Sequence, residues 1–151
     1  MSKEIISKFY QAFKALDAEA MAACYHNEVL FEDPAFGQLR GEHAGNMWRM
    51  LCQSQQDKGM VIEYDVISDH KAHWQAHYLF SKTGRKVHNR IEATFTFKEG
   101  LIIEHTDRFN LHKWAGMALG LQGQLIGWTP YFKNKLQAQT NRLLTKFESK
   151  H

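Results

Sequence analysis

The sequence predicts an α+β fold in which helices pack on one side of a curved antiparallel sheet. Three observations lead to this prediction. Apolar residues recur at helical spacing before Gly59, they alternate at a period of two after it, and turn signals separate the alternating segments. The chain has 151 residues, of which 44% are hydrophobic and 23% are charged. These values fit one globular domain with a sizeable core.

Three helices are expected in the N-terminal third of the chain. Ser2 can cap the first helix, in which apolar residues recur at intervals of three and four up to Leu16. Asp17 has the character of a second N-cap and opens the segment DAEAMAACYH. A third helix fits from Glu42 until Lys58-Gly59 breaks it.

Extended segments account for most of the remaining chain up to residue 111. A short one, Val29–Asp33, must end at Pro34, and a glycine-bracketed loop at 37–41 leads to the third helix. Four longer segments follow, with turn signals between them such as Glu99-Gly100. They predict an antiparallel meander made of 60–67, 73–80, 85–97 and 101–111.

Residues 112–151 are expected to form a helical extension of the same domain, which leaves residues 1–111 as the main fold. Thr129-Pro130 suits the N-cap and first position of a last helix. Glycines at 116, 120, 123 and 127 loosen the chain before it. We expect the apolar stripe of the last helix to bury against the rest of the protein or a second chain. The stripe comprises Leu136, Leu143, Leu144 and Phe147.

Charge and composition exclude several classes of protein. The net charge of +3 is too small to argue for a nucleic-acid partner. No run approaches 18 apolar residues, so no membrane span is expected, and the start MSKEIISKFY lacks the apolar region of a signal peptide. Cys24 and Cys52 form no disulfide framework, and we interpret them as buried thiols of a cytoplasmic protein.

Three groups of ionisable residues are candidates for chemistry. Strand alternation puts Glu32 and Asp33 on opposite faces, so only one of them can face the interior, although Asp33 can also simply shape the turn before Pro34. Arg90 and Glu92 share one face of a strand, which is either functional or a solvated outer face.

His105 and Asp107 share a face with apolar residues on the last strand, which is unusual for a plain core. Burial without partners would cost several kcal/mol, so they either serve a site or satisfy each other. His73 and His77 would lie about 13 Å apart on a strand, at about 3.3 Å per residue, which is too far to share a metal ion. No metal and no cofactor are therefore expected, and no motif for a nucleophilic Ser or Cys occurs.

The stretch FYQAFKALDAEAMAACYHNEVLFEDPAFGQLRG, together with the order of the predicted elements, resembles the nuclear transport factor 2-like superfamily. This superfamily includes ketosteroid isomerases, limonene-epoxide hydrolases and SnoaL-like polyketide cyclases. The resemblance covers about residues 3–111, and the tail HKWAGMALGLQGQLIGWTPYF resembles that of SnoaL-like proteins. It implies a cone, in which three N-terminal helices close over the concave face of a strongly bent sheet.

The resemblance also implies roles for individual residues. The isomerase pattern makes Asp33 the general base and Tyr10 a hydrogen-bond donor to the developing enolate, with Glu92 in the place of a second acid donor. Asp33, Glu92 and Asp107 should then converge on one cavity, close to Tyr10 and His105, and at least one carboxyl should have a raised pKa. The apolar residues expected to bind substrate are Phe9, Phe13, Trp48, Trp74, Tyr78 and Phe109.

The function implied is binding of a small hydrophobic or carbonyl-containing ligand, with ketosteroid isomerase-like proton transfer, by a homodimer. Two alternatives stay open. One is limonene-epoxide-hydrolase-like hydrolysis by Arg90, Glu92 and Asp107. The other is a ligand- or protein-binding module without catalysis, so the sequence leaves open whether the protein is an enzyme.

Overall fold

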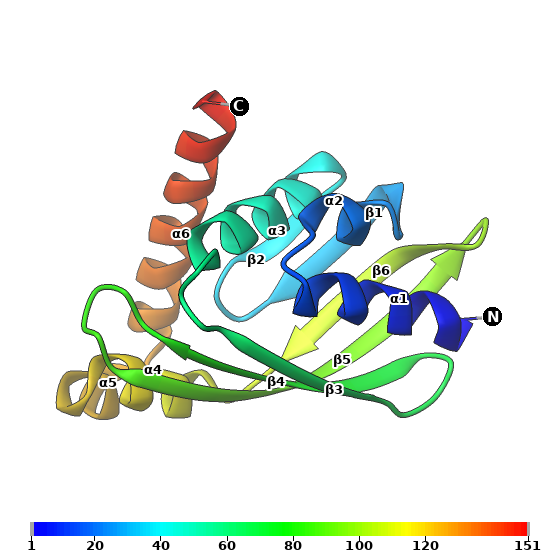
Figure 1. Ribbon diagram of the computed structural model, residues 1–151. Helices are drawn as coiled ribbons and strands as arrows, with labels where there is room; N and C mark the ends of the chain where they lie inside the picture. Colours follow the sequence, from blue (N-terminus) through cyan, green and yellow to red (C-terminus); the bar gives the residue numbers. More distant parts are fainter. Residues whose placement is uncertain (1, 151) are drawn as a thin grey trace.

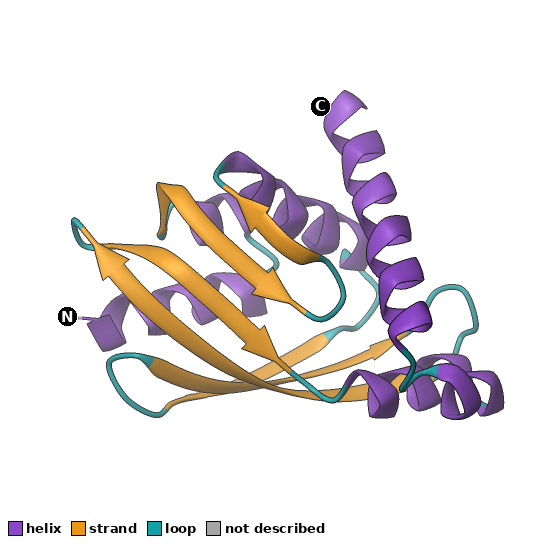
Figure 2. Ribbon diagram, turned by 180° about the vertical axis from the view of Figure 1, so that it is seen from behind, coloured by secondary structure: helices purple, strands orange, loops and turns teal. Residues whose placement is uncertain are grey.

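Helices and strands follow one another in the order that the sequence predicts, helices first and a meander afterwards (Figures 1 and 2). The computed structural model describes residues 2–150. The helices are α1 (Ser2–Lys14), α2 (Ala18–Ala22), α3 (Glu42–Gln55), α4 (Leu111–Leu119), α5 (Leu121–Ile126) and α6 (Pro130–Lys150). The strands are β1 (Tyr25–Asp33), β2 (Gly37–Arg40), β3 (Val61–Val66), β4 (Lys71–Leu79), β5 (Lys86–Lys98) and β6 (Leu101–Arg108).

The three N-terminal helices cover one face of the curved sheet (Figure 1). Helix α1 buries Ile6, Phe9, Tyr10 and Phe13, whose spacing of three and four residues places them on one side of the helix. Asp17 caps α2 as expected, because its Oδ1 accepts a hydrogen bond from the amide of Ala20 at 3.1 Å. The main core therefore lies between these helices and the inner face of the sheet.

The sheet has six strands in the order β2-β1-β6-β5-β4-β3, and the predicted meander forms β3 to β6. The prediction of a loop at 37–41 is wrong, because Gly37–Arg40 pairs with Leu30–Asp33 as a hairpin. Strand β1 begins at Tyr25 rather than Val29 and pairs with β6 in parallel. Pairing with β1 satisfies the backbone hydrogen-bonding groups of β6, which would otherwise be an edge strand of the sheet.

An irregularity in β6 decides which of its residues face the core. The register with β5 shifts between Thr96 and Phe97, where Phe97 pairs with Ile102 and Thr96 with Glu104. The extra residue, Ile103, reverses the alternation, so that Ile102 is buried before it and His105 and Asp107 are buried after it.

The C-terminal helices extend the core at one end of the sheet (Figure 2). Helix α4 forms a second cluster with Val87 and Phe132, while α6 runs beside α3 and the β1–β2 turn. Thr129 caps α6 as expected, accepting from the amide of Phe132 at 3.1 Å. No helix within residues 2–150 is long and apolar enough to cross a bilayer.

The predicted burial of the α6 stripe is only partly correct. Leu144 is buried in the main core, whereas Leu136 and Phe147 are half-buried. Leu143 is 48% exposed on this chain, so it is not buried against the rest of the protein, and its burial against a second chain stays a prediction. Adjacent residues of a helix point about 100° apart, so Leu143 and Leu144 cannot both face the core.

Candidate functional site

A buried imidazole lies at the centre of a chain of polar side chains inside the core. His105 is fully buried, and its Nε2 lies 2.9 Å from Oδ1 of Asp107 while its Nδ1 lies 2.8 Å from the hydroxyl of Tyr25. The indole of Trp48 donates to the Tyr25 hydroxyl at 2.9 Å, and the indole of Trp74 points at Asp107 Oδ1 at 3.4 Å.

The indoles of Trp48 and Trp74 donate at the two ends of this series of hydrogen bonds. An indole N–H only donates, so Tyr25 accepts from Trp48, and the tautomer in which the Tyr25 O–H donates to Nδ1 of His105 gives this buried hydroxyl proton an acceptor as well. Nε2 of His105 then carries the proton and donates to Asp107. The imidazole thus bonds two buried groups at once, which fits the interpretation of a pair that satisfies itself.

Aromatic rings enclose the imidazole and restrict its orientation. The ring of Phe95 stacks on His105 with centroids 4.4 Å apart, and Phe31 and Phe9 approach it edge-on at 5.0 and 5.4 Å. Such packing lowers the local dielectric, so charges in this part of the core act on one another strongly.

Asp33 ends β1, the strand beside β6, and its side chain lies on the same face of the sheet as His105 and Asp107. In the parallel register Phe31 lies beside His105 and Glu32 beside Thr106, so the next step brings Asp33 alongside Asp107. Its Oδ1 accepts from the amides of Ala35 at 2.9 Å and Phe36 at 2.6 Å. Asp33 therefore does shape the turn at Pro34, as one interpretation of the sequence holds.

Burial, followed by the charge of Asp107, raises the pKa of Asp33 to about 7, although the two backbone hydrogen bonds oppose this shift. The direction of this shift agrees with the expected raised pKa of one carboxyl, but its largest cause is the burial of Asp33 and not the convergence of three carboxylates.

The hydroxyl of Tyr10 is buried and has no hydrogen-bond partner within residues 2–150. Burial raises the pKa of Tyr10 well above its ordinary value, and the negative charge of Asp107 raises it further. The ring packs against Tyr64 and Trp74. A buried donor without an acceptor costs about 1–3 kcal/mol.

Glu92 and Arg90 lie on the outer face of the sheet, so the prediction that Glu92 joins Asp33 and Asp107 in the interior is wrong. The side chain of Glu92 is 69% exposed and bonds His73 at 2.7 Å, and Arg90 is exposed. Alternation along β5 gives the inward position to Ala93, which pairs directly with Asp107. The interior acid is thus carried by β6 rather than by β5.

Most of the apolar residues expected around the site lie there, but two lie at its edge. Phe9, Phe13, Trp48 and Trp74 belong to the main core cluster. Tyr78 and Phe109 pack between this cluster and the second one, and the Tyr78 hydroxyl accepts from the indole of Trp114 at 2.8 Å.

Tyr25 is the site residue that sequence analysis missed. It was assigned to the second helix, whereas it begins β1 and is buried there. The alternation of Tyr25 with later apolar residues could not have indicated it, because β1 carries a register shift between Tyr25 and Leu30.

The histidines on β4 bond separate carboxylates. His73 contacts Glu92, and His77 contacts Glu63 at 2.8 Å. Within residues 2–150 no group of three or more His, Cys, Asp or Glu residues is placed to hold a metal ion.

Helices that close over a curved sheet, with ionisable residues on its inner face, define a protein of the nuclear transport factor 2-like cone fold. The model of the SnoaL-like domain matches residues 6–105, and the chain belongs to this SnoaL-like family. No curated protein matches the chain by sequence.

Solved structures with the same fold are similar to this chain at low sequence identity. A candidate polyketide cyclase from Silicibacter sp. TM1040 is 19% identical with a TM-score of 0.58, over 78% of this chain and 94% of that one. A limonene-epoxide-hydrolase-like epoxide hydrolase from M. tuberculosis is 16% identical with a TM-score of 0.54, over 83% and 95%. A candidate isomerase from Bacillus subtilis is 16% identical with a TM-score of 0.56, over 78% and 91%.

Proposed function

We propose that the protein transfers a proton on a small hydrophobic carbonyl compound, with Asp33 as the base and Tyr10 as the hydrogen-bond donor to the developing enolate. The observation that carries the proposal is the buried Tyr10 hydroxyl, which has no partner within the described residues. A carbonyl oxygen would give this hydroxyl the acceptor that it lacks, and the bond would strengthen as negative charge develops.

Asp33 suits the role of base because its pKa is about 7. A base whose pKa lies near the working pH is present in its basic form and still has a high affinity for the proton. Both backbone hydrogen bonds to Asp33 go to Oδ1, which holds the carboxyl in one orientation and directs Oδ2 elsewhere. The base returns the proton to another carbon when the reaction is an isomerisation.

Asp107 and His105 act by positioning and by charge. Asp107 raises the pKa of Asp33 and so makes it a stronger base. His105 holds the carboxyl of Asp107 through Nε2 and is itself held by Tyr25, so the charge beside Asp33 stays in one place. That a candidate cyclase and a candidate isomerase share the fold is in keeping with this proposal.

Epoxide hydrolysis is the weaker alternative, because two of its three expected residues, Arg90 and Glu92, are on the outer face. A binding module without catalysis would use the same interior but would transfer no proton. The homodimer and the cytoplasmic location stay predictions.

The test is exchange of α-protons for deuterium in a panel of cyclic and unsaturated ketones, followed by NMR. Asp33→Asn should abolish exchange, while Glu32→Gln, which changes the neighbouring exposed carboxyl on the opposite face, should leave it intact. Tyr10→Phe should slow exchange by about 10²–10³-fold, the usual effect of losing one such donor. Unchanged exchange in Asp33→Asn would show that the base is a different residue, and ketone binding without exchange in any variant would favour the binding module.

A further inference from the structure

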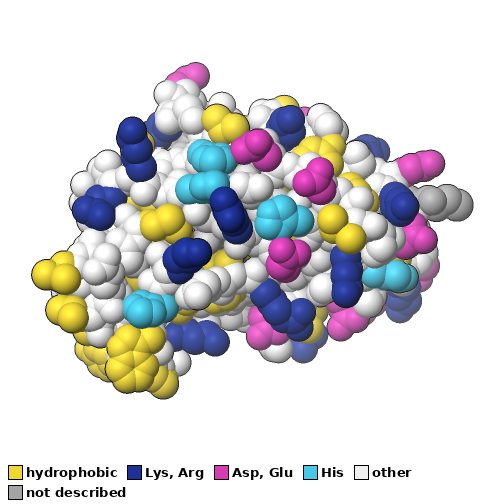
Figure 3. Space-filling model, turned by 90° about the horizontal axis from the view of Figure 1, so that it is seen from below, with side chains coloured by type: hydrophobic (Ala, Val, Ile, Leu, Met, Phe, Trp, Pro, Cys, Tyr) yellow, Lys and Arg dark blue, Asp and Glu magenta, His cyan; other side chains and the backbone are white. Residues whose placement is uncertain are grey.

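Five large apolar side chains stand exposed where α5 meets α6. The exposed fraction is 71% for Leu121, 65% for Leu125, 37% for Ile126 and 68% for both Trp128 and Tyr131. We call these five residues the apolar corner. Leu121 and Leu125 are four residues apart and share one side of α5. Figure 3 shows hydrophobic side chains gathered at one end of the molecule, beside Lys and Arg side chains.

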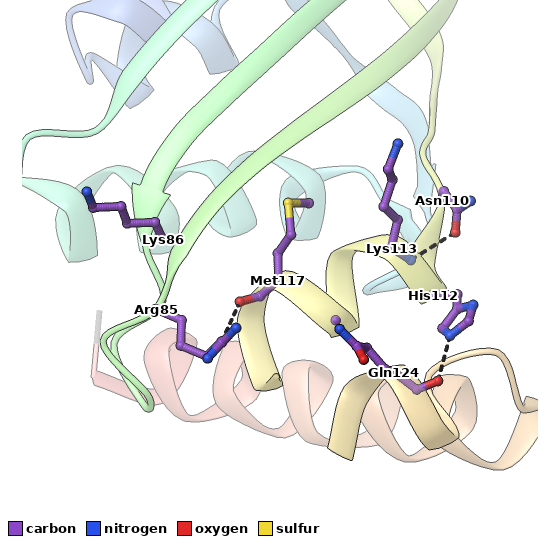
Figure 4. A pocket seen from close by; sticks show the side chains of 8 residues that line it. Arg85, Lys86, Asn110, His112, Lys113, Met117 and Gln124 are labelled. Atoms are coloured by element: carbon purple, nitrogen blue, oxygen red, sulfur yellow. Dashed lines mark hydrogen bonds between the residues drawn. The ribbon is translucent and has the colours of Figure 1, made fainter. Parts of the chain in front are cut away.

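A cationic cavity of about 630 Å³ adjoins the apolar corner, between α4, α5 and the turn that joins β4 to β5 (Figure 4). Arg85, Lys86 and Lys113 line it, together with Gln124, which lies on α5 between Leu121 and Leu125. Arg85 is held in place because its Nε donates to the carbonyl of Met117 at 2.9 Å. None of the eight residues that line this cavity is acidic.

The C-terminal part of the chain carries a net positive charge. Lys113, Lys133 and Lys135 lie at or near the apolar corner, whereas Arg142, Lys146 and Lys150 lie in the second half of α6. Residues 112–151 contain six Lys or Arg and one Glu, a net charge of +5, whereas residues 1–111 contain 13 against 15, a net charge of −2. Lys133 and Lys135 follow the apolar corner directly, and Nζ of Lys135 lies 5.8 Å from the centre of the Tyr131 ring.

We propose that the apolar corner docks the protein on an anionic membrane surface, with lipid phosphates held by the cationic cavity. Trp and Tyr side chains prefer the headgroup level of a bilayer, and leucines on a short amphipathic helix reach the acyl boundary below it. Lysines beside such a surface each strengthen attraction to anionic lipid by about fivefold in affinity.

Charge favours a membrane over a second copy of this chain as the occupant. A symmetric dimer through the apolar corner would bring the same cations of both copies together, including Lys133 and Lys135, and like charges disfavour such a contact. An anionic lipid surface instead complements both the apolar side chains and the charges around them. The proposal is independent of the proton-transfer chemistry, since no residue of the apolar corner belongs to that site.

Trp128 provides a natural reporter for the test. Of the four tryptophans, Trp48, Trp74 and Trp114 are buried, whereas Trp128 is 68% exposed. The full chain is mixed with vesicles of pure phosphatidylcholine or with vesicles that also contain the anionic lipid phosphatidylglycerol. We expect co-sedimentation with the anionic vesicles alone, a blue shift of the Trp128 emission, and quenching by brominated lipid.

Variants separate the apolar contribution from the charges. Leu125→Ser and Trp128→Ser should each lower the vesicle affinity at least about tenfold, whereas Ile67→Ser, which removes an equally exposed side chain from the β3–β4 turn, should leave it unchanged. Lys133→Glu with Lys135→Glu should lower the affinity for anionic vesicles and weaken its dependence on salt. Equal binding by Trp128→Ser and the unchanged chain, or no binding to anionic vesicles at low salt, would overturn the proposal. So would self-association in sedimentation equilibrium that Trp128→Ser abolishes while lipid has no effect.

Discussion

The imidazole Nε2 of His105 lies 2.9 Å from Oδ1 of Asp107, two residues further along the same strand. Residues at this spacing share a face of the sheet, so both side chains enter the core together. Each would be costly to bury alone, and each satisfies the other. The pair places an acceptor beside Asp33 and Tyr10, where the proposed chemistry occurs.

Replacing His105 by Leu should destabilise the protein by about 1–3 kcal/mol, because the buried carboxyl of Asp107 loses its shorter hydrogen bond and keeps only the longer one from Trp74. The Tyr25 hydroxyl loses its acceptor in the same step. Urea unfolding followed by fluorescence measures the change. The matched control is His73→Leu, which breaks the contact with the exposed Glu92 and should cost no more than about 1 kcal/mol. Equal costs for the two variants would contradict the importance assigned to the buried pair.

Tyr10→Phe should stabilise the protein slightly, by up to about 1 kcal/mol, while it slows proton transfer. The substitution removes a buried hydroxyl that has no hydrogen-bond partner in the described chain, so no internal bond is lost. Tyr25→Phe is the control with the opposite sign, because it removes the acceptor of Trp48 and the donor to His105 and should cost about 1–3 kcal/mol. Thermal unfolding of both variants at one pH is the measurement. Destabilisation by Tyr10→Phe would indicate that its hydroxyl has an internal partner.

The raised pKa of Asp33 makes stability depend on pH in a definite direction. Between its unfolded pKa of about 3.9 and its folded pKa of about 7, the native state binds more protons than the unfolded state, so stability falls as pH rises through this window. Asp33→Asn resembles the protonated form, so its advantage over the parent should be absent below pH 4 and grow to at most about 4 kcal/mol at pH 8. Glu32→Gln should show no such trend in urea titrations across this range.

The same carboxyl should control the pH profile of the reaction. The deprotonated form of Asp33 is the base, so kcat/KM should rise with pH through about 7. Asp107→Asn removes the charge that raises this pKa, and the rise should move to lower pH. An Asn at this position still accepts from His105 and Trp74, so the fold should survive. A profile that stays in place in Asp107→Asn would show that the two carboxyls do not interact.

Gly123 should tolerate no larger residue, because a Cβ there would lie 1.9 Å from the carbonyl oxygen of Ala115. Gly123→Ala should therefore separate α5 from α4 and cost more than about 2 kcal/mol. Gly116→Ala is the matched control: its Cβ would meet only the flexible Gln124 side chain, at 3.2 Å, so the change should be within about 1 kcal/mol and can stabilise the helix. Thermal unfolding checks both, and equal melting temperatures would contradict the close approach of the two helices.

The sequence by itself predicts the helices, the meander and the cap residues, because these depend on neighbours along the chain. The apolar spacing of Ile6, Phe9, Tyr10 and Phe13 predicts the buried face of α1, and Asp17 and Thr129 mark the starts of α2 and α6. The resemblance to the isomerase pattern also directs attention to Tyr10 and Asp33. His105 and Asp107 stand out because two polar residues share an apolar face.

The tertiary structure determines which of the candidate site residues lie close to one another. Sequence periodicity does not say which face of a strand points inward, and the resemblance to the isomerase pattern placed Glu92 in the interior that Ala93 occupies. The bulge at Ile103 and the parallel pairing of β1 with β6 depend on residues far apart in the chain, yet they bring Asp33 beside Asp107 and Tyr25 beside His105. Local patterns determine elements, whereas the register between distant strands determines which side chains share the low-dielectric interior and so acquire altered proton affinities.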